Sequence, residues 1–151
     1  KTRSMSIRPL RATRPSGPLE DLMGLLKWLG LADDKKEPLA LNDSNFHKEV
    51  MRSDIPVLVD IWSPGCGPCD ALAPTIMRLA AKYEGQVKVC HLDATQAPRT
   101  MGKLGVRGTP TVILYKSGGR VVERVVGLRA QNYFEEAIEE ELLDPAQASA
   151  A

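Results

Sequence analysis

The stretch Ile55-Pro56-Val57-Leu58-Val59-Asp60-Ile61-Trp62-Ser63-Pro64-Gly65-Cys66-Gly67-Pro68-Cys69 decides the fold of this chain. Its first half is an apolar run, which predicts a buried strand. Beyond the cysteines, apolar residues recur at helical spacing, so a helix should begin near Cys66. Pro68 suits the first turn of that helix, because no backbone N–H is needed there. The stretch therefore predicts a strand, a short loop and a helix, as in an α/β protein.

Cys66 and Cys69 have the spacing of a redox-active pair. A thiol at a helix start lies near free backbone N–H groups and the positive end of the helix dipole, which both favour the thiolate. We therefore expect Cys66 to be the nucleophile and Cys69 to resolve the mixed disulfide. A structural disulfide or half of a zinc site is the alternative, but His47 and His91 are not spaced as ligands.

Further segments stand in register with the cysteine pair. Asp60 lies six positions before Cys66, Thr109-Pro110 lies some forty residues after it, and His91-Leu92-Asp93 and residues 96–108 lie between. Together these segments resemble the thioredoxin family, which has a buried acid and a cis proline at the matching positions. The resemblance covers roughly residues 39–143. It implies the thioredoxin fold, with a central mixed β-sheet flanked by helices, and a protein disulfide reductase that acts through a CxxC dithiol.

The resemblance implies a catalytic role for Asp60. A carboxyl in an apolar strand is costly to ionise, so its pKa should be raised. Such a base could take the proton of Cys69 through water, although a local cap on the backbone is the alternative. His91 stands where the family usually has a buried lysine, and it is either the partner of Asp60 or an ordinary polar strand residue. Because histidine changes charge near neutral pH, any coupling to Asp60 should vary there.

The resemblance also implies a shallow apolar groove for substrate around Cys66. A cis proline turns the backbone and exposes groups that can pair with an extended substrate. The residues expected to bind substrate are Gly65, Gly108, Thr109, Pro110, Val126, Gly127 and Leu128. Those expected to tune the active site are Trp62, Gly67, Pro68, Asp70 and His91.

Two residues depart from the family pattern. Gly65 replaces the tryptophan that usually precedes the first cysteine, which should open the rim of the site. Asp70 replaces the usual Lys or Arg, and its negative charge should raise the pKa of the thiols. Both departures suggest an atypical set of partners. Cys90 is expected to be an ordinary strand thiol, with a redox or regulatory role as the alternative.

Strands and helices should alternate along the rest of the domain. We expect strands at residues 39–41, 57–62, 87–92, 111–115 and 120–126, and helices at about 42–52, 68–83, 96–104 and 129–143. Ser117-Gly118-Gly119 should form a hairpin turn between the last two strands. This order is typical of a mixed sheet between helices.

The first 38 residues are expected to form an N-terminal extension to the domain at 39–143, and residues 144–151 a flexible tail. Residues 1–18 carry five basic residues, three prolines and no acid, which predicts a disordered arm. Leu19–Leu31 has the periodicity of a short amphipathic helix, and residues 33–38 form a polar linker. The apolar face of the Leu19–Leu31 helix needs a surface to cover it. The alternatives are packing on the domain, self-association, a groove in a partner and a membrane interface.

Composition narrows the classes of partner and cofactor. The 151 residues carry a net charge of +1, so no overall attraction to nucleic acid is expected. Three cysteines make neither a disulfide framework nor a four-cysteine zinc site, and no cofactor or metal is expected. No apolar run is long enough to span a membrane. The expected partners are disulfide-containing proteins and an electron donor of the thioredoxin-reductase type.

Location and two other functions stay open. A single working cysteine pair fits a reducing compartment, so we expect a cytoplasmic protein. Because the chain begins at Lys1 and not at Met, a removed signal or anchor would instead indicate an exported or membrane-tethered protein. The alternative functions are a partner-binding module on this scaffold and an exported disulfide oxidase or isomerase.

Overall fold

The structure of the chain is a computed structural model that describes Leu22, Leu25 and residues 36–143. The chain divides into two units, residues 1–34 and 35–151. In the first unit, Leu22 and Leu25 are helical with exposed side chains. The rest of the predicted helix Leu19–Leu31, the basic arm and the C-terminal tail lie outside the described residues.

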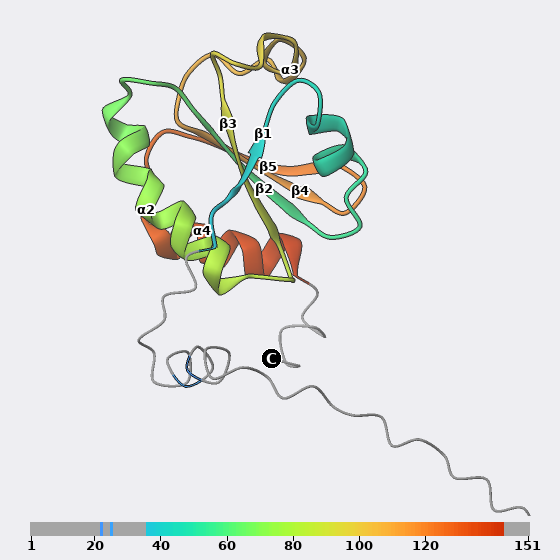
Figure 1. Cartoon of the computed structure of the whole chain (residues 1–151), viewed down its shortest axis with the longest axis vertical. Helices are drawn as coiled ribbons and strands as arrows, with labels where there is room; N and C mark the ends of the chain where they lie inside the picture. The colour runs from blue at the N-terminus through green and yellow to red at the C-terminus, as the bar shows by residue number, and fades with distance from the viewer. Residues whose placement is uncertain (1–21, 23–24, 26–35, 144–151) are drawn as a thin grey trace, which may run out of the picture. The chain divides into compact units, whose positions relative to one another are not determined.

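Strands and helices follow one another in the predicted order across residues 36–143 (Figure 1). The strands are β1 (Leu39–Leu41), β2 (Val57–Trp62), β3 (Lys88–Asp93), β4 (Thr111–Lys116) and β5 (Arg120–Val126). The helices are η1 (His47–Met51), α2 (Gly67–Lys82), α3 (Pro98–Leu104), α4 (Gln131–Ala137) and η2 (Ile138–Leu142). Within residues 36–143 the strands form one five-stranded mixed sheet of order β1-β3-β2-β4-β5. The predicted fold class, a mixed sheet flanked by helices, is confirmed.

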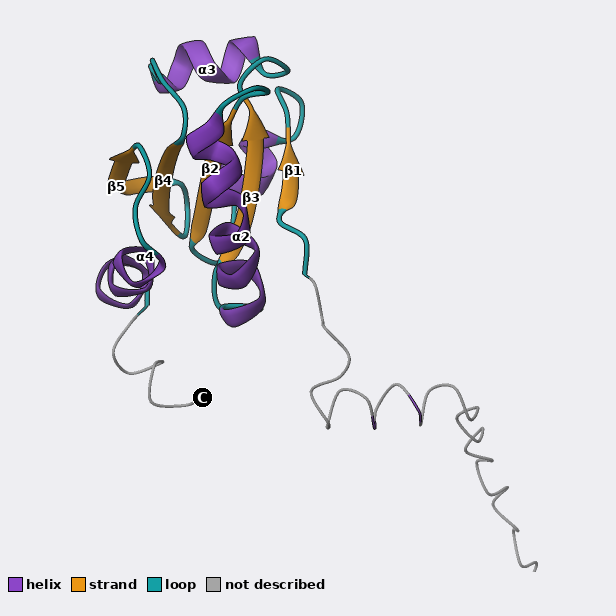
Figure 2. Cartoon of the chain, turned by 90° about the vertical axis from the view of Figure 1, so that its left-hand side faces the viewer, coloured by secondary structure: helices purple, strands orange, loops and turns teal. Residues whose placement is uncertain are grey.

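Strand β2 lies at the centre of the sheet, parallel to β3 and antiparallel to β4. Leu58 faces the buried cluster formed with α2 and α4, whereas Val57, Val59 and Ile61 face the cluster formed with η1 and α3. Figure 2 shows α2 in front of the sheet and α3 at one end of it. Because both faces of β2 are covered, the strand is apolar at almost every position, as a central strand should be.

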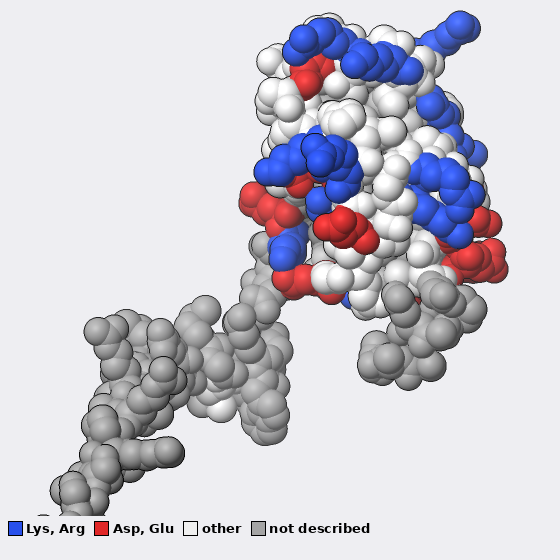
Figure 3. Space-filling view, turned by 90° about the vertical axis from the view of Figure 1, so that its right-hand side faces the viewer, with Lys and Arg blue, Asp and Glu red and all other residues white. Residues whose placement is uncertain are grey.

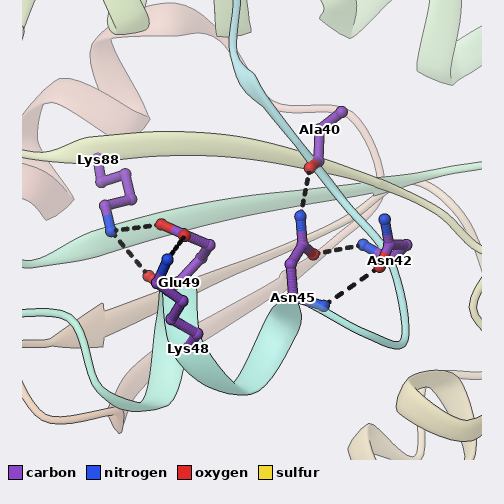
Figure 4. A network of polar contacts seen from close by, with 6 residues as sticks. All are labelled: Ala40, Asn42, Asn45, Lys48, Glu49 and Lys88. Carbon is purple, nitrogen blue, oxygen red and sulfur yellow. Dashed lines mark hydrogen bonds and ion pairs between the residues drawn. The ribbon is translucent and has the colours of Figure 1, made fainter.

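Helix η1 begins after a turn that Asn42 caps (Figure 4). The Asn42 Oδ1 accepts hydrogen bonds from the backbone N–H groups of Ser44 and Asn45, at 2.8 and 3.2 Å. The helix is shorter than the predicted segment 42–52, and it has π-helical hydrogen bonding: the N–H of Arg52 donates to the carbonyl oxygen of His47. Figure 4 also shows Lys88 of β3, whose Nζ lies 3.1 Å from a carboxylate oxygen of Glu49.

Helix α3 is capped by a residue from a distant part of the chain. The Asp43 carboxylate accepts hydrogen bonds from the backbone N–H groups of Thr100, at 2.7 Å, and Arg99, at 3.2 Å. Although burial alone would raise the pKa of Asp43, the hydrogen bonds from Thr100 and Arg99 lower it overall. The loop after β1 therefore supplies the cap that the sequence next to α3 lacks.

The predicted hairpin turn lies between β4 and β5. Gly118 and Gly119 have φ angles of 78° and 81°, in the left-handed region that favours glycine. A Cβ on Gly119 would lie 2.8 Å from Cα of Met51 at the end of η1, whereas a Cβ on Gly118 would have no atom within 4 Å. The close approach of the hairpin to η1 therefore depends on Gly119.

Two alanine substitutions separate the backbone strain from this contact. We expect Gly118→Ala to lower the free energy of unfolding by about 1 kcal/mol, because only the left-handed backbone is penalised. Gly119→Ala should lower the free energy of unfolding by about 3 kcal/mol, because a clash with the Met51 backbone adds to the same backbone strain. Urea unfolding of both variants measures the difference. Equal losses would mean that the approach of Met51 does not matter.

Candidate active site

The two cysteines lie at the start of α2, directly after the central strand. Cys66 is the N-cap of the helix, with φ −95° and ψ 103°. Its Sγ accepts a hydrogen bond from the backbone N–H of Cys69, and the N and S atoms are 3.3 Å apart. The pair forms a disulfide. Cys66 is half-buried, whereas Cys69 is 5% exposed. A partner can therefore reach the sulfur of Cys66 but not that of Cys69.

A tight turn, Ser63-Pro64-Gly65-Cys66, connects β2 to this helix. Gly65 has φ 74°, and a Cβ built on it would meet no atom within 4 Å. Pro64 and Gly65 are both exposed. A proline followed by a glycine with positive φ is typical of the middle of a type II turn. Space is therefore open where the family has tryptophan, but a larger residue would strain the backbone here.

Asp60 lies in β2 with its carboxyl buried under α2. The residue is 5% exposed, and its Oδ1 has no hydrogen-bond partner among the described residues. Burial raises the pKa of Asp60 to about 7. The carboxyl lines a pocket of about 300 Å³, and the other lining residues are Glu37, Pro38, Ala73, Ile76, Met77 and His91. The pocket can hold water beside a group that is poised to exchange a proton near neutral pH.

His91 lies beside Asp60 on the neighbouring strand. The two residues are register partners in the parallel pair β2–β3, and both line the same pocket. The ring of His91 stacks on that of Trp62, with centroids 6.4 Å apart and planes at 17°. His91 therefore shares the pocket with Asp60, while its ring contact is with Trp62.

The loop before β4 forms the other side of the site. The Thr109–Pro110 peptide bond is cis, and the carbonyl oxygen of Thr109 lies 3.6 Å from Cys66 Sγ. The hydroxyl of Thr111 donates to the carbonyl oxygen of Gly108 at 2.7 Å, and the N–H of Gly127 donates to that of Pro110 at 2.9 Å. The loop is thus attached to both β4 and the end of β5.

Apolar side chains of the predicted groove are exposed. Val126 is 60% exposed and Leu128 is 47% exposed, and Gly108 is exposed between Arg107 and the cis bond. Asp70 is exposed in the first turn of α2. The residues expected around the groove differ in exposure. Gly65, Gly67, Pro68, Asp70, Gly108, Val126 and Leu128 are exposed, Thr109 and Gly127 are half-buried, and Pro110 is buried. Asp60 and His91 instead line the pocket beneath α2.

Sequence reasoning missed one residue of this region. The hydroxyl of Ser63 lies 2.8 Å from the hydroxyl of Thr109 and forms a hydrogen bond with it across 46 residues of sequence. Ser63 has no local signal that would distinguish it from an ordinary loop serine. Only the pairing of β2 with β4 brings the two hydroxyls together.

Cys90 lies on the opposite face of the sheet. Its side chain is fully buried in the cluster that includes Val59 and Ile61, whereas α2 packs on the other face. Burial raises the pKa of the Cys90 thiol to about 12. A neutral, buried thiol is inert, which favours the expected structural role.

Figure 3 shows basic and acidic side chains scattered among uncharged ones over one face of the domain. Among residues 36–143 with Leu22 and Leu25, no group of three or more His, Cys, Asp or Glu residues could hold a metal ion.

None of the helices in this described part is both long and apolar enough to cross a membrane.

Comparison with known proteins gives one consistent family. A family model described as Thioredoxin matches residues 37–140. Thioredoxin 1 of Nostoc sp. is 39% identical over 102 residues, which cover 68% of this chain and 94% of that protein. Thioredoxin of Synechocystis sp. is 42% identical over 87 residues, 58% of this chain and 80% of that protein. The chloroplastic M-type thioredoxin of Pisum sativum is 40% identical over 103 residues, 68% of this chain and 59% of that protein.

Replacing Asp60 with asparagine tests the cost of burying its carboxyl. The pKa of Asp60 is raised from 3.8 to about 7 in the folded protein, so the unfolded chain ionises first as the pH rises. The protonated carboxyl makes its full contribution to the free energy of unfolding below about pH 4, and this contribution is lost as the pH rises to about 7. We expect Asp60→Asn to raise the free energy of unfolding at about pH 8 by up to about 4 kcal/mol. The difference should be small at about pH 4.

Urea unfolding of the oxidised protein at both pH values measures this effect. Asp54→Asn, at an exposed carboxyl, is the control for the loss of one negative charge. A gain from Asp60→Asn that is the same at both pH values would contradict the raised pKa.

Proposed function

Since this chain belongs to the thioredoxin family and is a thiol-disulfide oxidoreductase, we propose that it reduces disulfide bonds in other proteins, with Cys66 as the attacking thiol. The observation that carries this assignment is the difference in burial of the two cysteines. Cys66 is half-buried at the N-cap of α2, and Cys69 is 5% exposed. A substrate can therefore form its mixed disulfide with Cys66, while Cys69 waits beneath it.

In the first step the Cys66 thiolate attacks one sulfur of the substrate disulfide. A bond forms between Cys66 Sγ and that sulfur, the substrate S–S bond breaks, and the other sulfur leaves as a thiolate. The backbone N–H of Cys69, 3.3 Å from Cys66 Sγ, and the start of α2 favour negative charge on the attacking sulfur.

In the second step Cys69 attacks Cys66 Sγ, which forms the Cys66–Cys69 disulfide and releases the second substrate thiolate. Cys69 must first lose its proton. We assign the proton acceptor to the Asp60 carboxylate, acting through water in the pocket beneath α2. A pKa of about 7 makes this carboxyl an effective base near neutral pH. His91 lines the same pocket and, in this proposal, modulates Asp60.

The substrate chain is proposed to lie over the loop that contains Thr109 and Pro110. The carbonyl oxygen of Thr109 is 3.6 Å from Cys66 Sγ, so a chain that pairs with this backbone would present its disulfide to the nucleophile. Val126 and Leu128 offer exposed apolar surface for the same chain. The open rim at Gly65 and the charge of Asp70 would favour partners other than those of a typical family member.

We assign catalysis to the domain at residues 39–143, and propose that the extension at 1–38 provides a separate contact, through Leu19–Leu31, to a second copy or a partner. The electron donor that returns Cys66 and Cys69 to the dithiol is proposed to be of the thioredoxin-reductase type. A reducing, cytoplasmic location fits one exchanging cysteine pair and a buried free thiol at Cys90.

Cysteine substitutions test the proposed roles. Cys66→Ala should lower the rate of insulin reduction by dithiothreitol to the rate without protein, because the attacking sulfur is absent. Cys69→Ser should accumulate a mixed disulfide with substrate, which mass spectrometry detects as an added mass. Cys90→Ala is the matched control and should keep the activity, because Cys90 lies on the other face of the sheet. Activity that survives in Cys66→Ala would exclude the proposed nucleophile.

The role of Asp60 is tested by the rates of the two steps. Asp60→Asn should slow the release of product at about pH 7.5 roughly tenfold or more, because the proton acceptor is lost, while the first attack changes less. In the unsubstituted protein, release should slow as the pH falls below about 7, since a protonated carboxyl accepts no proton. Rapid-quench mass spectrometry of single turnovers follows both steps. Equal slowing of attack and release would put the proton acceptor elsewhere.

A further inference from the structure

The hydroxyl pair of Ser63 and Thr109 joins the two loops that form the site. Ser63 follows β2 and opens the turn that ends at Cys66, and Thr109 precedes the cis bond before β4. The two hydroxyl oxygens are 2.8 Å apart, and either can donate. Both residues are half-buried, so water competes less for this hydrogen bond than on an open surface.

One of the two loops is firmly attached to the sheet. The hydroxyl of Thr111 holds the carbonyl oxygen of Gly108 at 2.7 Å, and the N–H of Gly127 holds that of Pro110 at 2.9 Å. Thr111 itself is buried in β4. The backbone of Thr109 therefore has neighbours on both sides that are fixed to β4 and to the end of β5.

The other loop has little packing of its own. Pro64 and Gly65 are exposed, and a Cβ on Gly65 would meet no atom within 4 Å. The middle of the turn thus lacks packed side chains, whereas Ser63 and Cys66 at its two ends are half-buried. Two side-chain contacts link the turn to the fixed loop: the hydrogen bond of Ser63, and Cys66 Sγ, which lies 3.6 Å from the carbonyl oxygen of Thr109.

We propose that the Ser63–Thr109 hydroxyl pair is a positioning contact, which holds Cys66 Sγ at a fixed distance from the Thr109 backbone and so favours disulfides within an extended protein chain over small free disulfides. The inference rests on the proposed function, in which Cys66 attacks and the Thr109 loop binds substrate. A protein substrate must pair with that loop and present its sulfur to Cys66 at once. A small disulfide needs only to reach Cys66, so the distance between the loops matters less to it.

The test compares two substrates of the reduced, full-length protein. The protein substrate is insulin, and the small substrate is 5,5′-dithiobis(2-nitrobenzoic acid). For Ser63→Ala we expect the ratio of kcat/KM for insulin to the rate with the small disulfide to fall about fivefold, as for the loss of one hydrogen bond. The loss should appear mainly in KM, because the pair positions substrate and does not act on the reacting atoms.

A double-mutant cycle tests whether the two hydroxyls act together. Thr109→Val removes the second hydroxyl with little change in shape, and the variant with both substitutions should show no larger fall in the ratio than Ser63→Ala alone. Thr109→Ser keeps a hydroxyl and should keep the ratio of the unsubstituted protein within about twofold. If Ser63→Ala does not fold, the comparison of Thr109→Val with Thr109→Ser tests the same contact.

The outcomes separate this inference from the proposed function. An unsubstituted protein that reduces neither disulfide would overturn both. Reduction of both disulfides, with the ratio unchanged in Ser63→Ala, would overturn the inference alone. Equal losses on the two substrates would show that the hydroxyl pair only stabilises the fold, and additive effects of the two substitutions would show that the hydroxyls do not act together. Either result would overturn the inference.

Discussion

Burial of β2 on both faces is the constraint on which the rest of the structure depends. The strand lies between β3 and β4, and its alternate residues enter two separate cores. A strand in this place cannot shift by one residue, because each side chain would then enter the wrong core. The position of the strand end is fixed in turn, and with it the point where the turn at residues 63–66 begins. The turn that carries the reactive sulfur therefore starts from a strand that is buried on both faces.

Asp60 is an ionisable residue in this buried, otherwise apolar strand, and its burial carries a cost in free energy. A carboxyl among buried apolar residues destabilises the ionised form, which is why its pKa is about 7 and not 3.8. The same burial supplies a base that changes charge near neutral pH. The carboxyl lines a pocket of about 300 Å³ that can hold water, and His91 and Glu37 line the same pocket. Stability and the proposed proton transfer thus place opposite demands on this residue, as is common at functional sites.

The sequence was sufficient where the signals are local. An apolar run predicted the strand at 57–62, which β2 matches, and apolar residues at helical spacing predicted the helix at 68–83, which α2 matches to within one residue at each end. The cysteine pair could be selected because its spacing is typical of a redox pair, whereas Thr109-Pro110 could be selected only through the resemblance to the thioredoxin family. Contacts between distant segments could not be predicted, since Asp43 and Ser63 each look like ordinary turn residues. Their roles, as the cap of α3 and the partner of Thr109, exist only once the sheet brings their partners near.

The placement of Cys90 has a consequence for electron flow within the molecule. Three cysteines allow three different pairings, and thiol–disulfide exchange would interconvert them if the sulfurs could meet. The sheet separates Cys90 from the face that α2 covers. The Cys90 thiol also stays protonated, because burial raises its pKa to about 12. In the proposed mechanism, exchange therefore stays between Cys66 and Cys69 and does not reach Cys90. Each molecule then carries two electrons per cycle, and the third thiol adds none.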